Sequence, residues 1–135
     1  MFSVTRLIHF CYGHRLLDYE GKCKHPHGHN GRIEITIETK GLDARGMVMD
    51  FGDIKKHVQS WVDEELDHKM LLNARDPLVE ILRTLGEPVV TLEGNPTAEN
   101  IAKHIFEYAR GKKLPVSAVR LWETENSFAE YRAAP

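Results

Sequence analysis

A strict alternation of side chains over residues 32–38 constrains the fold more than any other stretch of the sequence. Ile33, Ile35 and Ile37 share one face of an extended chain, and polar or charged side chains occupy the opposite face. A period of two is typical of a strand that is buried on one side only. The pattern therefore predicts a sheet with one buried face, which needs a second layer to cover it.

Helical segments can supply that covering layer. Apolar residues recur at helical spacing between residues 50 and 67, with Asp50 available as an N-cap. A second long helix is expected over residues 96–111, because Asn95 is a good N-cap and a proline follows it at the first helical position. A short helix is expected over residues 77–85.

Three more strands are expected, over residues 2–12, 116–124 and 127–133. The order of elements is then β-β-α-α-β-β. This order favours an α+β fold in which helices pack on one face of an antiparallel four-stranded sheet. The sequence has no repeat, low-complexity tract or long linker, so residues 1–135 are expected to form a single domain.

Charge and hydropathy exclude several classes of protein. The 18 basic and 20 acidic residues nearly cancel and form no run of like charge, so nothing favours binding to nucleic acid or to an anionic membrane. The first residues lack a signal-peptide pattern, and no stretch approaches the ~18 apolar residues of a membrane span. We therefore expect a cytoplasmic protein with a small-molecule partner, whose two cysteines are poor disulfide candidates.

The stretch CKHPHGHN, residues 23–30, concentrates metal-binding side chains. His27 and His29 are two apart at the start of the best strand, so an extended backbone would direct both imidazoles from the same face. His14 follows the first strand, and an antiparallel hairpin would bring it alongside. Three histidines with an open fourth position are typical of a catalytic zinc site, whereas the competing interpretation is a turn-rich surface loop.

Cys23 has two possible roles that spacing alone leaves open. As a fourth ligand it would close the metal site and make it structural. As a free thiol it would suit a base or nucleophile, because the flanking Lys22 and Lys24 favour the thiolate. His25 is expected to face solvent.

Two acidic groups raise separate questions. His68 with Asp67 beside it could be a general base whose orientation the carboxylate fixes, or simply the polar end of a helix. Glu123 has the same parity as Val119 and Leu121, so it is expected to project from the buried face of its strand. A carboxylate there needs a partner.

Taken together, these residues resemble the family of 6-pyruvoyltetrahydropterin synthase and 6-carboxytetrahydropterin synthase. The matching blocks occur in order from about residue 2 to residue 133: His14, Cys23-x3-His27-Gly28-His29, GMVMDF at 46–51, LDH at 66–68, PTAEN at 96–100 and ET at 123–124. The resemblance implies the tunnelling fold, or T-fold, in which three subunits close their sheets into a barrel. Two trimers usually stack into a homohexamer, with active sites between subunits.

The resemblance also implies roles for seven residues: His14, His27 and His29 as zinc ligands, Cys23 as the catalytic thiol, Asp67 and His68 as the acid–base pair, and Glu123 as the group that anchors a pterin. The expected activity is that of a zinc-dependent lyase acting on 7,8-dihydroneopterin triphosphate. The ending ETENSFAEY favours the carboxy-type product, formed with loss of acetaldehyde on the route to queuosine, over the pyruvoyl product. A non-catalytic pterin- or zinc-binding module would need neither the thiol nor the acid–base pair.

One segment departs from the family pattern. The residues before the zinc histidine are usually small, often two alanines, whereas here Cys11, Tyr12 and Gly13 precede His14. The pocket wall beside the metal is therefore expected to differ. Cys11 itself is expected to be a packing residue, because free cysteine behaves as a small buried hydrophobe.

Overall fold

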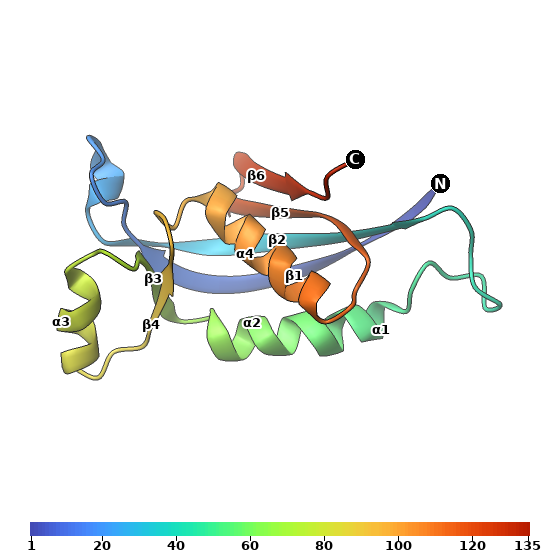
Figure 1. Cartoon of the computed structure of the whole chain (residues 1–135), viewed down its shortest axis with the longest axis horizontal. Coiled ribbons are helices and arrows are strands. Elements are labelled where there is room, and N and C mark those ends of the chain that lie inside the picture. Colours follow the sequence, from blue (N-terminus) through green and yellow to red (C-terminus); the bar gives the residue numbers. More distant parts are fainter.

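A twisted six-stranded sheet runs the length of the molecule in the computed structural model, which describes residues 1–135 (Figure 1). The strands lie in the order β4-β3-β1-β2-β5-β6. Four of them form the antiparallel part of the sheet: β1 (Phe2–His14), β2 (His27–Thr39), β5 (Val116–Thr124) and β6 (Ser127–Arg132). These are the four strands that the sequence predicts, with β1 and β2 longer than expected.

The prediction of a four-stranded sheet in β-β-α-α-β-β order is wrong, because two short strands extend the sheet. β3 (Lys69–Asn73) pairs parallel to β1, and β4 (Val89–Leu92) pairs parallel to β3. Both strands are too short to show a period, and parallel strands at the end of a sheet lack the alternation that marks β2. Their pairing comes from tertiary contacts rather than from local pattern.

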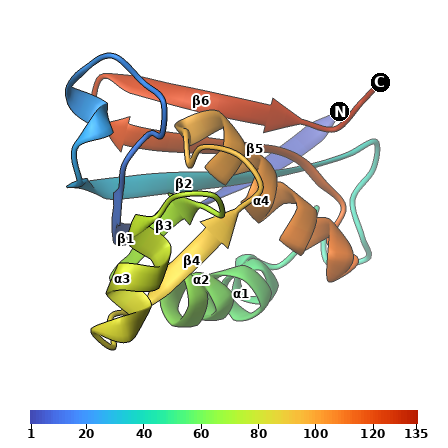
Figure 2. The ribbon, with the colours of Figure 1, turned by 60° about the vertical axis from the view of Figure 1, so that its left-hand side comes forward.

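Helices cover one face of the sheet (Figures 1 and 2). α1 (Phe51–Ile54), a π-helical stretch (Lys55–Gln59) and α2 (Ser60–Glu65) follow one another without a break, and the Asp50 side chain caps the start by accepting from the Gly52 N–H. α4 (Ala98–Gly111) lies beside them. None of the helices is both long and apolar enough to cross a membrane.

Two details of the helices differ from expectation. The N-cap of α4 is Thr97, whose hydroxyl accepts from the Asn100 N–H, and not Asn95. The Asn95 side chain instead bonds both the N–H and the C=O of Leu17, at 2.9 and 2.8 Å, and so ties the loop after β1 to the start of α4. α3 (Leu78–Thr84) forms where a short helix is expected, but it lies at the end of the sheet beside β4 rather than over its face.

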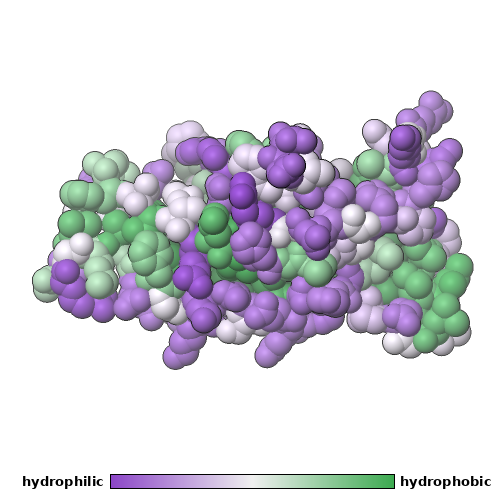
Figure 3. All heavy atoms as spheres, turned by 180° about the vertical axis from the view of Figure 1, so that it is seen from behind, coloured by the Kyte–Doolittle hydropathy of each residue, from purple (hydrophilic) through white to green (hydrophobic).

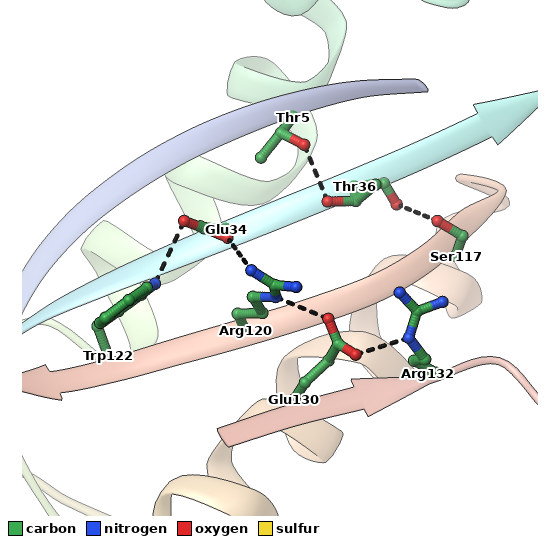
Figure 4. Close-up of polar contacts among 8 residues, drawn as sticks. All are labelled: Thr5, Glu34, Thr36, Ser117, Arg120, Trp122, Glu130 and Arg132. Carbon is green, nitrogen blue, oxygen red and sulfur yellow. Dashed lines mark hydrogen bonds and ion pairs between the residues drawn. The ribbon is translucent and has the colours of Figure 1, made fainter. Parts of the chain in front are cut away.

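The alternation of β2 explains the two-faced character of the sheet. Ile33, Ile35 and Ile37 are fully buried and belong to one core with the apolar faces of α1, α2 and α4. The opposite face carries a polar network centred on Arg120 and Glu130 (Figure 4). Arg120 Nε donates to Glu130 Oε1 at 2.7 Å, and Glu34 accepts from the Trp122 indole at 3.2 Å. The antiparallel part of the sheet thus has one apolar and one charged surface.

Candidate metal centre and active site

The hairpin of β1 and β2 brings His14, His27 and His29 together. His14 is paired directly with His27 across the two strands, and Tyr12 is paired with His29. One ring nitrogen from each histidine lies within 4.8 Å of the other two. The Nε2 atoms of His14 and His29 are 3.1 Å apart. Extended backbone from His27 onward therefore produces the convergence that the two-residue spacing predicts.

The donor set fits a divalent metal of the zinc type. His14 Nδ1 donates to the Pro96 carbonyl and His27 Nδ1 to the His25 carbonyl, each at 2.7 Å. With those protons on Nδ1, both Nε2 atoms carry lone pairs. The Nε2 of His27 is buried without any hydrogen-bond partner. Imidazoles whose Nδ1 is held by a carbonyl, and whose Nε2 atoms converge, are a ligand arrangement common in zinc sites.

Burial favours the neutral, metal-binding form of His14 and His29. Burial lowers the pKa of His14, and the Pro96 carbonyl only partly opposes that shift. Burial likewise lowers the pKa of His29, against the opposing effect of the Glu123 carboxylate. Two of the three histidines are thus ready to coordinate without first losing a proton.

Glu123 lies on the helix-covered face of β5, as its parity predicts. Its oxygens are 3.8 Å from His14 Nε2 and 3.9 Å from His29 Nε2, and its side chain is 29% exposed. The carboxylate therefore borders the histidine cluster and keeps an accessible edge.

Asp67 and His68 form a hydrogen-bonded pair directly after α2. Asp67 Oδ2 accepts from His68 Nδ1 at 2.7 Å, and Asp67 Oδ1 accepts from the Cys11 N–H at 2.8 Å. Burial alone would raise the pKa of Asp67, but these two hydrogen bonds outweigh it, and the pKa is lowered. The carboxylate therefore stays ionised and fixes the His68 tautomer, which leaves Nε2 as a proton acceptor.

The backbone of His68 supports a functional interpretation of this pair. His68 has φ 60°, in the left-handed region that non-glycine residues rarely adopt. Glycine or asparagine usually occupies this position after a helix. The His68 N–H donates to the Cys11 carbonyl at 2.7 Å, and its side chain is 76% exposed. A histidine kept at a strained, exposed position favours a chemical role over a packing role.

The two cysteines differ from expectation in one respect, which is the position of Cys11. Cys11 is not buried in the core: it is partly exposed, and its sulfur lies within 4.8 Å of ligand atoms of Asp67 and His68. Cys23 lies in a 3₁₀ turn of the β1–β2 loop and belongs to neither this cluster nor the histidine cluster. Sequence reasoning missed the position of Cys11, because β3 was needed to place Asp67 and His68 beside β1.

Arg15, directly after the first histidine of the cluster, forms an ion pair with Asp76. Its Nε and Nη2 donate to the two oxygens of Asp76 at 2.7 and 2.5 Å. The Asp76 side chain is fully buried, and it also accepts from the Leu78 N–H at the start of α3. The hydrogen bonds from Arg15 lower the pKa of Asp76. Lys22 and Lys24 remain as exposed cations near the loop.

Replacing Arg15 by methionine is expected to lower the free energy of unfolding by about 3 kcal/mol, because the buried Asp76 carboxylate loses its cation. Urea denaturation at neutral pH measures the loss. Arg45→Met is the matched control: Arg45 pairs with Asp43 at the surface and its side chain is 59% exposed, so little change is expected. Equal losses in both variants would contradict a stabilising buried pair.

The same ion pair sets a pH dependence. Because the folded protein holds the pKa of Asp76 below its ordinary value, the pair stabilises the fold above the unfolded-state pKa of about 4. That contribution is lost as the pH falls through the lower folded-state pKa. The difference in unfolding free energy between the unaltered protein and Arg15→Met is therefore expected to narrow between about pH 5 and about pH 2.

An open hollow of about 730 Å³ joins the two groups of side chains. Among the residues that line it are His27 and His29 from the histidine cluster, and Cys11 and His68 from the acid–base pair and its neighbour. Converging imidazoles and an oriented Asp–His pair at one hollow define a class of α+β protein whose side chains could hold a metal ion and transfer a proton.

Comparison with known proteins narrows this class. The family model described as 6-pyruvoyl tetrahydropterin synthase matches residues 3–134. The chain therefore belongs to the 6-pyruvoyl tetrahydropterin synthase family. It is 42% identical over 137 residues to the 6-carboxy-5,6,7,8-tetrahydropterin synthase of Rickettsia bellii, covering 96% of this chain and 99% of the relative. It is 31% identical over 145 residues to the 6-pyruvoyl tetrahydrobiopterin synthase of Pongo abelii, covering 96% and 90%.

The fold agrees with this family. The solved structure of the 6-pyruvoyl tetrahydropterin synthase of Caenorhabditis elegans superposes with a TM-score of 0.74 at 25% identity, covering 98% of this chain and 96% of that one. The family resemblance seen in the sequence is thereby confirmed. The fold of the single subunit is also that of the family, with the six-stranded sheet as the correction.

Proposed function

We propose that the chain is a 6-carboxy-5,6,7,8-tetrahydropterin synthase that converts 7,8-dihydroneopterin triphosphate and releases acetaldehyde and triphosphate, on the route to queuosine. The observation that carries this proposal is the convergence of His14, His27 and His29 beside the Glu123 carboxylate. It is supported by identity over nearly the whole chain to a relative of that name. Several other relatives carry the same name, including one from Haemophilus influenzae at 31% identity.

Zinc, held by His14, His27 and His29, would supply Lewis acidity toward oxygens of the substrate side chain. The pterin ring needs a separate anchor. Glu123 offers two carboxylate oxygens with an accessible edge, and the amino-pyrimidine edge of a pterin presents paired N–H donors. Glu123 would thus hold the ring with its side chain directed toward the imidazoles.

The acid–base work falls to His68 and a thiol. His68 Nε2 accepts or returns a proton, while Asp67 keeps the proton on Nδ1 and stabilises the imidazolium. Cys23, as thiolate, would take a proton from the substrate side chain. Lys22 and Lys24 flank it, and their charges suit the triphosphate.

An active site formed between two subunits would bring Cys23 of one chain to the Asp67–His68 pair of another. Cys23 does not belong to the cluster that contains Asp67 and His68 in one chain, and a second copy would supply the missing members of the proposed set. Apolar surface lies toward both ends of the molecule (Figure 3). One end includes Phe2 and Phe51, 49% and 48% exposed, and such patches favour protein contacts. A homotrimer or homohexamer would cover these surfaces and the free edges of β4 and β6.

Incubation of zinc-loaded protein with 7,8-dihydroneopterin triphosphate is expected to yield acetaldehyde and 6-carboxytetrahydropterin in equal amounts. A coupled assay for acetaldehyde and chromatography of the pterins measure the two products. A pyruvoyl product without acetaldehyde would assign the chain to the other branch of the family. Tight binding of the pterin without any product would contradict catalysis and leave a binding module.

A further inference from the structure

Tyr12 belongs to the segment that departs from the family pattern, and its ring lies against two histidines of the cluster, His14 and His29. Its ring is 3% exposed and stacks on Phe10 at a centroid distance of 4.9 Å. The rings of His14 and His29 lie 5.2 and 5.6 Å from it. The Tyr12 ring therefore has packed neighbours on several sides.

Gly31 makes room for this ring. A Cβ atom at position 31 would lie 2.8 Å from Phe10 Cε1 and 3.0 Å from Tyr12 Cε1, closer than side chains tolerate. The rings of Phe10 and Tyr12 on β1 thus occupy the space that a side chain at position 31 on β2 would fill. Burial and stacking on Phe10 restrain the ring, so the phenol oxygen is held in place.

The fixed hydroxyl reaches the Glu123 carboxylate. Tyr12 O–H donates to Glu123 Oε1 at 3.4 Å, and this is the only side-chain hydrogen bond between Glu123 and the rest of the chain. The nearby imidazole of His14 does not compete as a donor, because its proton lies on Nδ1 toward Pro96. A phenol carries its proton at neutral pH, so the hydroxyl is the donor and the carboxylate the acceptor.

We infer that Tyr12 is a positioning residue for pterin binding: its hydroxyl holds one Glu123 oxygen so that the remaining lone pairs face the amino-pyrimidine edge of the ring. The inference rests on the proposed role of Glu123. A carboxylate has about four acceptor positions, so one phenol bond leaves enough capacity for two N–H donors of the pterin. Tyr12 does not touch the reacting bonds, so its effect falls on binding rather than on the chemical step.

Tyr12→Phe keeps the stacked ring and removes only the hydroxyl. The variant is expected to bind neopterin, a pterin without the triphosphate, about fivefold more weakly than the unaltered protein, the effect of one ordinary hydrogen bond. Fluorescence titration of the zinc-loaded and zinc-free proteins measures binding without turnover. KM for the triphosphate substrate should rise by a similar factor while kcat stays within about twofold. Tyr108→Phe, in the ring stacked on Trp61, is the matched control and should change neither.

A double-mutant cycle with Glu123→Gln tests whether Tyr12 acts through the carboxylate. The Tyr12→Phe change is expected to have little further effect in the Glu123→Gln background. An equal loss in both backgrounds, or loss of zinc in Tyr12→Phe, would overturn the inference. Unchanged neopterin binding in Tyr12→Phe with a clear loss in Glu123→Gln would overturn it too, and leave the proposed function intact. If Glu123→Gln bound neopterin as tightly as the unaltered protein, Glu123 would not be the pterin anchor. The role inferred for Tyr12 would then be wrong as well.

Discussion

Zinc-loaded Cys23→Ala protein is expected to turn over 7,8-dihydroneopterin triphosphate about 10³-fold more slowly than the unaltered protein, because a positioned proton acceptor contributes that order of rate. Its zinc content should not change, since the three converging imidazoles do not include the thiol. Product formation and metal analysis on the same sample measure both quantities. Loss of zinc along with activity would make Cys23 a ligand and contradict its catalytic role.

Cys11→Ala is the matched control for this experiment. Cys11 is the thiol that lies beside His68 within one chain, whereas Cys23 is not part of that cluster. Its replacement is expected to leave most of the activity, because the backbone N–H and C=O of residue 11, which hold Asp67 and His68, remain. If Cys11→Ala were inactive and Cys23→Ala active, the catalytic thiol would be Cys11 on β1 and not Cys23.

Mixed oligomers extend the Cys23 test to the arrangement of subunits. If Cys23 of one subunit works with Asp67 and His68 of another, co-expressed Cys23→Ala and His68→Ala chains should form some complete sites. Mixtures of the two inactive variants would then recover activity. A mixture as inactive as its parts would argue against shared sites.

His27→Ala is expected to lower zinc affinity by at least about 100-fold, more than the loss of an outer-shell partner would cause. The buried Nε2 of His27 has no other partner, so its removal takes away a ligand without breaking a hydrogen bond at that atom. Competition with a chromophoric chelator measures the affinity. His25→Ala is the control: its side chain is exposed, and the carbonyl that orients His27 is unaffected. Full zinc affinity in His27→Ala would contradict the three-histidine site.

Strong local pattern made the antiparallel half of the fold predictable. The alternation of Ile33, Ile35 and Ile37 identified β2, and the extension of that strand back to His27 gave the convergence of imidazoles. β3 and β4 were missed because a strand of four or five residues owes its conformation to its neighbours. The cap of α4 was misplaced for a similar reason: Asn95 satisfies a distant loop, and Thr97 is left to cap the helix.

In the candidate site, too, local pattern predicted some residue positions, and contacts between distant strands determined the others. Parity alone placed Glu123 on the covered face of β5, because side-chain direction in a strand depends on register and not on packing detail. The surroundings of Cys11 and Tyr12 depended on strand neighbours distant in sequence. Cys11 needed β3 to bring His68 beside it, and Tyr12 needed Gly31 across the hairpin. The residues that adjoin Cys11 and Tyr12 in the sequence give no indication of either contact.

The direct pairing of His14 with His27 has a mechanical consequence for the loop between them. Residues 15–26 leave the sheet at one imidazole and return at another, and Cys23 lies on this excursion. An ion shared by the two imidazoles would fasten both roots of the loop and reduce the conformations open to its tip. Removing the ion with a chelator would then increase the mobility of the loop that carries Cys23, in addition to removing the Lewis acid. Loss of the metal would thus impair the position of the thiol, although the thiol is not a ligand.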